Sequence, residues 1–331
     1  GVGVLSQLKK IRVRPLAFES LGVRSMSTLV QTPDISLLID PGVALGPRRP
    51  MFPHPREYAA RNESRARIVE AASKSDILFV SHYHHDHYTP NYMEMVWLGS
   101  TPDIAESIYK DKIILAKDVR DSINFSQRRR GWVFRKSVEK YAKDFLTADN
   151  KTLEYGGTKM RFSSPVYHGE EDSELGWVLM LSIASNDERL VYASDVQGPM
   201  SNETVKVILA EKPDLLILGG PPLYLKGFKV SEDSISMGLE NIARLTSELS
   251  VTILDHHLLR SSDWRRSLRK AFKAAKRSGN ILITAAEFLG AKNLLLESIR
   301  QKLYDEYPPT KEFIRWTRLS KEERRKTPPP V

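Results

Sequence analysis

The sequence has 331 residues, and its 50 Lys and Arg exceed its 41 Asp and Glu, so the formal net charge is +9. It contains no Cys, which excludes disulfides, Cys-ligated zinc sites, iron–sulfur clusters and thiol nucleophiles. Any transition-metal site must therefore use His, Asp and Glu. No stretch approaches the roughly 18 apolar residues of a membrane span, and segment 1–14 lacks the apolar core of a signal peptide. We therefore expect a cytoplasmic protein with no membrane partner.

Apolar runs and helical patterns predict one domain over residues 1–304, followed by a polar, Pro-rich tail over 305–331. In chain order, strands are expected at 10–18, 36–40, 76–81, 112–116, 159–163, 176–183, 189–193, 213–218, 251–254 and 281–284. Helices are expected at 57–75, 118–144, 231–247, 263–277 and 286–304. Several successive strands have no helix between them, which favours layered mixed sheets. We expect the tail to be extended and docked through Phe313, Ile314 and Trp316.

The strongest chemical signal is the segment 82–87, which reads H-Y-H-H-D-H and leaves the expected strand at 76–81. Imidazole and carboxylate are donors that zinc, iron and manganese accept. A loop with this spacing can direct ligands to two metal ions a few Å apart. Two ions need more ligands than one loop supplies. Further candidates follow other expected strands, namely His168, Asp195 and either His256 or His257.

This order of motifs resembles the metallo-β-lactamase fold superfamily over most of the chain. The resemblance implies a layered α/β fold, a four-layer αββα sandwich of two mixed β-sheets with a dinuclear metal site at one edge. Carried over position by position, one metal would be held by His82, His84 and His168, and the other by Asp86, His87 and His256, with Asp195 bridging. Asp40, the acid at the end of an earlier strand, would brace the His loop without binding metal.

The last ligand has two candidates because His256 and His257 are adjacent. Segment 254–260 resembles the His-centred strand end of the superfamily's RNA-processing branch, which selects His256. His257 and His85 are then expected to support the ligands or to face solvent. The sequence also resembles the superfamily's archaeal metal-dependent hydrolase branch, through S-H-Y-H at 81–84 and G-P-P-L-Y-L at 220–225.

The resemblance implies a metal-dependent hydrolase with two divalent ions, expected to be Zn²⁺, with Fe or Mn as alternatives. Two metals lower the pKa of a shared water, so that a bridging hydroxide can attack an electrophile. Asp86 and Asp195 would orient that hydroxide as catalytic carboxylates. A phosphodiesterase or nuclease-like reaction is the leading hypothesis. Hydrolysis of small esters, thioesters or lactones is the second, and a narrow pocket covered by 47–56 and 219–229 would favour it. A non-enzymatic nucleic-acid-binding or ribosome-associated protein is the third.

The positive charge is concentrated in two segments. Segment 128–143 holds seven basic residues against one acid, and segment 260–277 holds eight against one. A basic surface beside a two-metal site suits a phosphate-bearing substrate such as RNA or DNA. Because the second segment begins four residues after His256, we expect Arg260 and Arg265 to contact substrate. A solvated helical face is the alternative explanation of the same charge.

Overall fold

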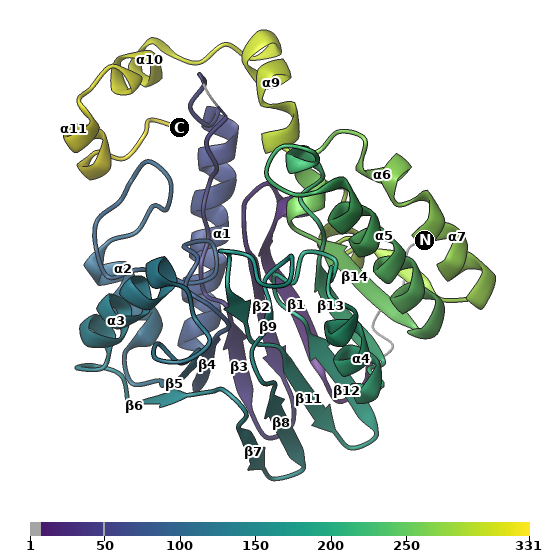
Figure 1. The fold of residues 1–331 in the computed structure, drawn as a ribbon. Helices are drawn as coiled ribbons and strands as arrows, with labels where there is room; N and C mark the ends of the chain where they lie inside the picture. The colour runs from purple at the N-terminus through teal and green to yellow at the C-terminus, as the bar shows by residue number, and fades with distance from the viewer. Residues whose placement is uncertain (1–7, 49) are drawn as a thin grey trace.

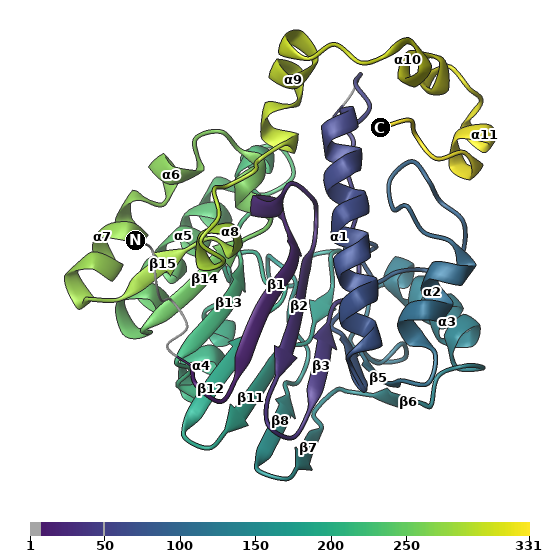
Figure 2. The same ribbon diagram turned by 180° about the vertical axis from the view of Figure 1, so that it is seen from behind.

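A computed structural model describes residues 8–48 and 50–331. Two mixed β-sheets pack face to face, and helices cover both outer faces (Figures 1 and 2). The predicted four-layer αββα sandwich is therefore confirmed. The expectation that segment 1–14 is not a signal peptide falls largely on residues 1–7, which lie outside the described residues.

The first sheet has six strands that are neighbours in chain order. They are β1 Arg12–Phe18, β2 Met26–Gln31, β3 Ser36–Ile39, β4 Ile77–Val80, β5 Ile113–Ala116 and β6 Asp144–Thr147. The pairs from β1 to β3 are antiparallel, and those from β3 to β6 are parallel. All of β4 and the last three residues of β3 are apolar and buried, as is usual for strands covered on both faces.

The second sheet has seven strands in the order β15-β14-β13-β12-β11-β8-β7. They are β7 Thr152–Tyr155, β8 Thr158–Phe162, β11 Leu181–Ser185, β12 Glu188–Tyr192, β13 Leu215–Gly219, β14 Val251–Asp255 and β15 Ile281–Ile283. The strands from β12 to β15 are parallel, and the others pair antiparallel. Two short strands, β9 Val166–Tyr167 and β10 Trp177–Val178, form a separate ladder.

Three apolar clusters separate the four layers. The central cluster lies between the sheets and joins Phe79 of one to Phe162 of the other, with ring centroids 5.0 Å apart. The first sheet is covered by α1 Pro55–Ser73, α2 Pro102–Tyr109 and α3 Phe125–Val138. The second is covered by α4 Asn202–Glu211, α5 Glu232–Glu248, α6 Trp264–Ser267 and α7 Arg269–Ser278. None of the helices within 8–48 and 50–331 combines the length and apolarity needed to cross a bilayer.

The prediction of a single helix over 286–304 is wrong. Instead, α8 Ala285–Phe288 is one turn long, and α9 Arg300–Glu306 begins after an irregular segment and a 3₁₀ turn, η4 Glu297–Ile299. Gly290, with φ +72°, lies two residues beyond the end of α8 in the left-handed region that favours glycine. The Asn293 amide then donates to the Glu287 carboxylate at 3.0 Å, which holds the chain in a non-helical path.

The prediction of an extended tail is wrong. The tail instead forms two helices, α10 Lys311–Thr317 and α11 Lys321–Lys326. Thr310 and Ser320 cap these helices by accepting hydrogen bonds from backbone N–H groups. Phe313 and Trp316 dock as expected and are buried against the core of α1, whereas Ile314 is 40% exposed. The expected domain boundary at residue 304 stays a prediction.

We expect Trp316→Ala to lower the free energy of unfolding by about 3–5 kcal/mol, because it empties a buried aromatic site. The indole ring contacts Phe52 and Tyr58 at centroid distances of 5.8 and 5.6 Å, and its N–H donates to the Thr327 carbonyl. Chemical denaturation followed by circular dichroism measures the loss. Ile314→Ala is the matched control from the same helix and should change stability by no more than about 0.5 kcal/mol. Equal effects of the two variants would contradict the docking.

Candidate metal centre

Strand ends bring the predicted residues to one edge of the sandwich. Asp40 follows β3 and the segment 82–87 follows β4, which are parallel neighbours in the first sheet. Asp195 and His256 follow β12 and β14, which belong to the parallel part of the second sheet. His168 follows β9. Parallel strands end at the same edge, so residues distant in sequence meet there.

Asp40 is fully buried and accepts four hydrogen bonds. The Ser81 N–H and hydroxyl donate at 2.7 and 2.6 Å, the His87 Nδ1–H at 2.8 Å and the Tyr192 hydroxyl at 2.6 Å. Ser81 and His87 belong to the His loop of the first sheet, and Tyr192 belongs to β12 of the second. The carboxylate therefore fixes the loop and joins it to the other sheet, as the bracing role expected of Asp40 requires.

The chain before the loop also fits closely against it. A Cβ atom on Gly42 would lie only 2.3 Å from the backbone nitrogen of Tyr88. No side chain can be accommodated at that separation without moving the backbone. Gly42 therefore allows the strand end that carries Asp40 to lie directly against the His loop.

In three of the imidazoles, the nitrogen that faces away from the cluster contacts an oxygen atom of the surrounding protein. His87 uses Nδ1 for its bond to the brace carboxylate, and His168 Nδ1–H donates to the backbone carbonyl of Asp195. The Nδ1 of His256 lies 3.4 Å from Glu19 Oε1. Hydrogen bonds from behind thus orient the rings of His87 and His168, whereas His256 Nδ1 faces the Glu19 carboxylate without a hydrogen bond.

The predicted ligands form two adjoining groups with donor atoms within 4.8 Å of one another. One group is His82, His84, His168 and Asp195, and the other is Asp86, His87 and His256. Asp195 lies between them: its Oδ2 is 3.0 Å from His257 Nε2, 3.3 Å from His256 Nε2, 3.6 Å from His168 Nε2 and 3.9 Å from His87 Nε2. This buried His/Asp cluster is compatible with metal ions.

The donor set also fits a cation on physical grounds. Two of its buried atoms, His82 Nε2 and Asp195 Oδ1, make no hydrogen bond among the described residues, and a buried polar atom without a partner is costly. Burial and the neighbouring imidazoles hold the pKa of both His82 and His84 well below its usual range. Both rings are therefore neutral at pH 7, which is the form that binds metal.

The carboxylates and the imidazole of His256 are charged, whereas burial lowers the pKa of His168 and favours its neutral form. Burial disfavours the carboxylate of Asp86, but the imidazoles of His87 and His256 outweigh it and lower its pKa. Burial likewise disfavours charge on His256, but the Asp195 carboxylate outweighs it and raises the pKa of His256 to about 10. Metal binding must therefore displace a proton from His256.

The geometry distinguishes His256 from His257. The Nε2 of His256 reaches two carboxylates, Asp195 at 3.3 Å and Asp86 at 3.5 Å. His257 reaches only Asp195, and its Nδ1 lies 3.3 Å from the Tyr224 hydroxyl. Its ring is also stacked with that of Tyr224, with an angle of 20° between the planes. His256 therefore lies between the two ligand groups. His257 belongs to a further group with Asp195 and His256 that could hold a metal ion, so His256 as the last ligand stays a prediction.

Sequence reasoning missed Glu19, which is 5% exposed and lies behind His256. It also binds Arg260, whose Nη2 is 2.6 Å from Glu19 Oε1. The signal that would have found Glu19 was available, since it is an acid directly after β1, whose last four residues are buried, as Asp40 is after β3. Glu19 and Arg260 are 241 positions apart in the sequence, so no local pattern indicates their contact.

Substrate contact by Arg260 and Arg265 stays a prediction, and the structure pairs each of these side chains with an acid. Arg260 is 3% exposed and is neutralised by Glu19, although its Nη2 lies 3.9 Å from Asp86 Oδ2. Arg265 pairs with Glu287 at 2.7 Å. A short 3₁₀ turn, η3 His257–Arg260, turns the chain inward after β14, so this basic segment starts inside the protein.

His85 points away from the ligand groups. Its Nε2 lies 3.0 Å from the Tyr92 hydroxyl, and it lines a cavity of about 390 Å³ at the edge of the cluster. We call this the mouth cavity. Its other lining residues are Arg24, Ala44, Leu45, His84, Asp86, Tyr92, Glu94, Trp97, Leu98 and Arg130. The metal-ligand cluster thus opens to a cavity that contains basic residues from outside segment 260–277.

The chain resembles archaeal proteins over nearly its whole length. It is 41% identical over 297 residues to the UPF0282 protein of Methanopyrus kandleri, covering 89% of this chain and 100% of that protein. It is 41% identical over 295 residues to the UPF0282 protein of Methanocaldococcus jannaschii, covering 88% and 96%. The metallo-β-lactamase fold protein YhfI from Bacillus subtilis aligns with a TM-score of 0.46 and 17% identity, covering 86% and 98%. No family model matches the sequence.

We expect His84→Ala to lower the metal-to-protein ratio from about two to about one, because it removes a ligand from one group. Elemental analysis of the dialysed protein measures the ratio. His85→Ala is the matched control, since His85 is the adjacent imidazole and its ring nitrogen binds Tyr92 instead. It should keep both ions, and equal loss in the two variants would contradict the assignment.

His256→Ala and His257→Ala should differ in the same measurement. The first removes the imidazole between Asp86 and Asp195, so we expect the ratio to fall to about one or below. The second leaves both ligand groups complete and should retain about two ions per chain. The reverse order would make His257 the ligand.

Proposed function

The chain belongs to the UPF0282 family of archaeal proteins, and we propose that it is a dinuclear metal-dependent hydrolase that cleaves phosphodiesters. The observation that carries the proposal is the position of Asp195. Its Oδ2 lies within 3.6 Å of His168 in one ligand group and within 3.3 Å of His256 in the other. A carboxylate between two sets of ligands is suited to bridge two ions.

We propose Zn²⁺ as the metal, because imidazole and carboxylate donors suit it, while iron and manganese accept the same donors. One ion would be held by His82, His84 and His168, and the other by Asp86, His87 and His256, with Asp195 shared. Bound at such a site, two divalent ions supply hydroxide near neutral pH and stabilise negative charge that develops in the reaction.

The side chains supply the remaining requirements of hydrolysis. Asp86 remains ionised because nearby imidazoles lower its pKa, so it can accept a hydrogen bond from a nucleophilic water and orient it. His257 donates to Asp195 through Nε2 and contacts Tyr224 through Nδ1. Burial and Arg260 lower the pKa of His257 to about 3. His257 is therefore neutral and holds Asp195 in position without adding charge.

The cavity next to the cluster favours phosphodiesters over small esters. Among the described residues, its lining contains none from segments 47–56 or 219–229, the covers that a narrow ester pocket was expected to have. It contains Arg24 and Arg130 instead. Arg24 is neutralised by Glu297 through two hydrogen bonds of 2.6 and 2.7 Å, so Arg130 is left as the cation suited to a phosphate.

The test is hydrolysis of bis(p-nitrophenyl) phosphate by the zinc-loaded protein, with His84→Ala as the variant. We expect kcat/KM to fall by at least about 100-fold, because metal assistance contributes several kcal/mol to such reactions. Removal of metal with EDTA should abolish the activity, and added Zn²⁺ should restore it.

p-Nitrophenyl acetate and a short-chain thioester are assayed in parallel. Hydrolysis of these compounds with no cleavage of the phosphodiester would replace the proposal with the ester-hydrolase alternative. Full phosphodiesterase activity in His84→Ala would show that the cluster does not perform the reaction. The third possibility, a binding protein without catalysis, corresponds to metal-loaded protein that is inactive on every substrate.

A further inference from the structure

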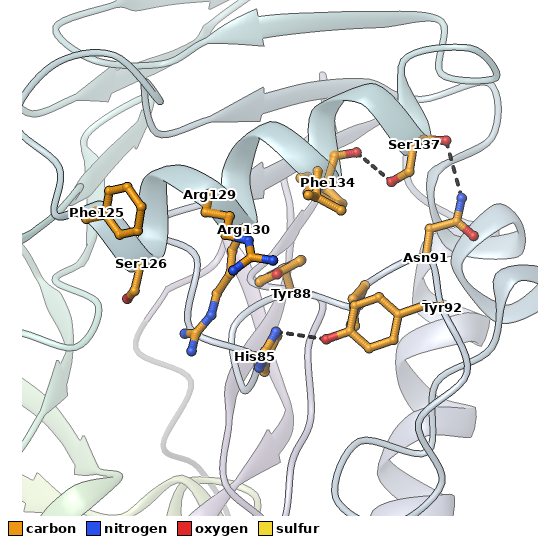
Figure 3. A pocket seen from close by; sticks show the side chains of 12 residues that line it. His85, Tyr88, Asn91, Tyr92, Phe125, Ser126, Arg129, Arg130, Phe134 and Ser137 are labelled. Atoms are coloured by element: carbon orange, nitrogen blue, oxygen red, sulfur yellow. Dashed lines mark hydrogen bonds between the residues drawn. The ribbon is translucent and has the colours of Figure 1, made fainter. Parts of the chain in front are cut away.

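Two cavities adjoin beside the metal-ligand cluster. One is the mouth cavity, and the other, which we call the α3 cavity, runs along helix α3 (Figure 3). Each has a volume of about 390 Å³, within the range of small-ligand sites. They share His85, Tyr92 and Arg130 as lining residues. The α3 cavity therefore lies directly beside the cavity that opens onto the cluster.

The α3 cavity is positively charged. Arg129 and Arg130 line it, and Figure 3 shows both side chains leaving α3 on the side that faces His85. Within residues 8–48 and 50–331, neither forms an ion pair with a carboxylate, and the hydrogen bond that Arg130 makes is a long one, 3.4 Å, to the Tyr83 carbonyl. By contrast, Arg135 of the same helix faces Glu139 at 3.4 Å. Unpaired guanidinium groups are suited to bind phosphate.

The start of α3 adds to this charge. The helix begins after Asn124, whose side chain accepts a hydrogen bond from the Gln127 N–H, and its first turn contains no acidic residue to neutralise the partial positive charge of its N-terminus. Ser126, in that first turn, lines the α3 cavity. The lining of the mouth cavity contains two acids, Asp86 and Glu94. The Glu94 carboxylate already accepts hydrogen bonds from the N–H groups of residues 96–98.

The same cavity exposes apolar surface. Phe125 is 82% exposed and Val133 is 55% exposed, and both line it. An aromatic ring at that exposure gains nothing from the protein core, whereas a ligand base could stack on it. Asn91 lies at the other end of the cavity, where its amide donates to the Ser137 carbonyl at 3.3 Å. Guanidinium groups suited to bind phosphate and an exposed ring suited to stack on a base thus line one cavity.

We propose that the α3 cavity is a subsite for one nucleoside monophosphate unit of a phosphodiester substrate, the unit adjacent to the bond cleaved at the metal-ligand cluster. This rests on the proposed function. Arg129 and Arg130 bind the phosphate of that unit, and Phe125 stacks on its base. Both arginines come from the basic segment 128–143, so the subsite also gives that segment a role.

The test is isothermal titration calorimetry of the full-length protein, as purified, with AMP and with ribose 5-phosphate. We expect AMP to bind at least about fivefold more tightly, because stacking on one aromatic ring contributes about 1–3 kcal/mol. Arg130→Gln should weaken AMP binding by at least about tenfold, as expected for a lost hydrogen bond to a charged group. Phe125→Ala should weaken AMP binding and leave that of ribose 5-phosphate unchanged.

Arg128→Gln is the matched control, because it removes the same charge from the same helix at a residue that does not line either cavity. It should bind AMP within about twofold of the unaltered protein, since distant surface charges are screened. Equal AMP binding by Arg128→Gln and Arg130→Gln would overturn the subsite. So would equal affinity for AMP and ribose 5-phosphate.

The two proposals fail in different ways. If AMP binding depends on Arg130 and Phe125 but no phosphodiester is cleaved, the subsite stands and the proposed hydrolase falls. If a dinucleotide is cleaved with the same kcat/KM by Arg130→Gln and Arg128→Gln, the hydrolase stands and the subsite is overturned. AMP binding therefore tests whether the α3 cavity binds a nucleoside monophosphate, and kcat/KM for the dinucleotide tests whether that unit lies next to the cleaved bond.

Discussion

The buried carboxylate of Asp40 is the constraint on which the metal centre depends. Burying a charge is expensive unless hydrogen bonds replace the water it loses. Asp40 receives four such bonds, from Ser81, His87 and Tyr192. The Ser81 hydroxyl also lies 2.7 Å from that of Ser194, directly before Asp195. The carboxylate is satisfied only when both sheets and the His loop occupy their native positions, so the site and the sandwich form together.

A second buried carboxylate, Asp255, organises the opposite side of the cluster. It accepts hydrogen bonds from the N–H groups of Ser20, His256 and Ala285, which ties the end of β14 to η1 Glu19–Leu21 and to α8. Glu19 is thereby held behind His256, whose backbone has φ +77°. A non-glycine residue in that region is strained and is retained where the surroundings determine it. The strain at His256 is therefore offset by contacts that set the direction of its imidazole.

The layers and the gathering of the His and Asp residues in one buried cluster were predictable because their signals are local. The motif at 82–87 lies in one loop, and Asp195 and His256 each follow a short apolar strand that is recognisable without its neighbours. What could not be predicted depends on contacts between distant residues. Tyr192 reaches Asp40 across 152 positions, and nothing in the sequence around either residue indicates the pair. The choice between His256 and His257 likewise depends on which ring faces Asp86, a property of the backbone turn after β14.

The position of the positive charge shows the same limit. Of the two basic segments, 260–277 lies closer in sequence to a predicted metal ligand. However, Arg260 forms an ion pair with Glu19, and α7 packs Ala271 and Ala275 into the outer core. Segment 128–143 is distant in sequence from every ligand, yet the parallel order of β4 and β5 brings the helix that follows β5 beside the His loop that follows β4. In a layered fold the helix after a neighbouring parallel strand is adjacent to the site by topology. Strand order, rather than proximity in sequence, therefore determines which basic segment can meet a substrate.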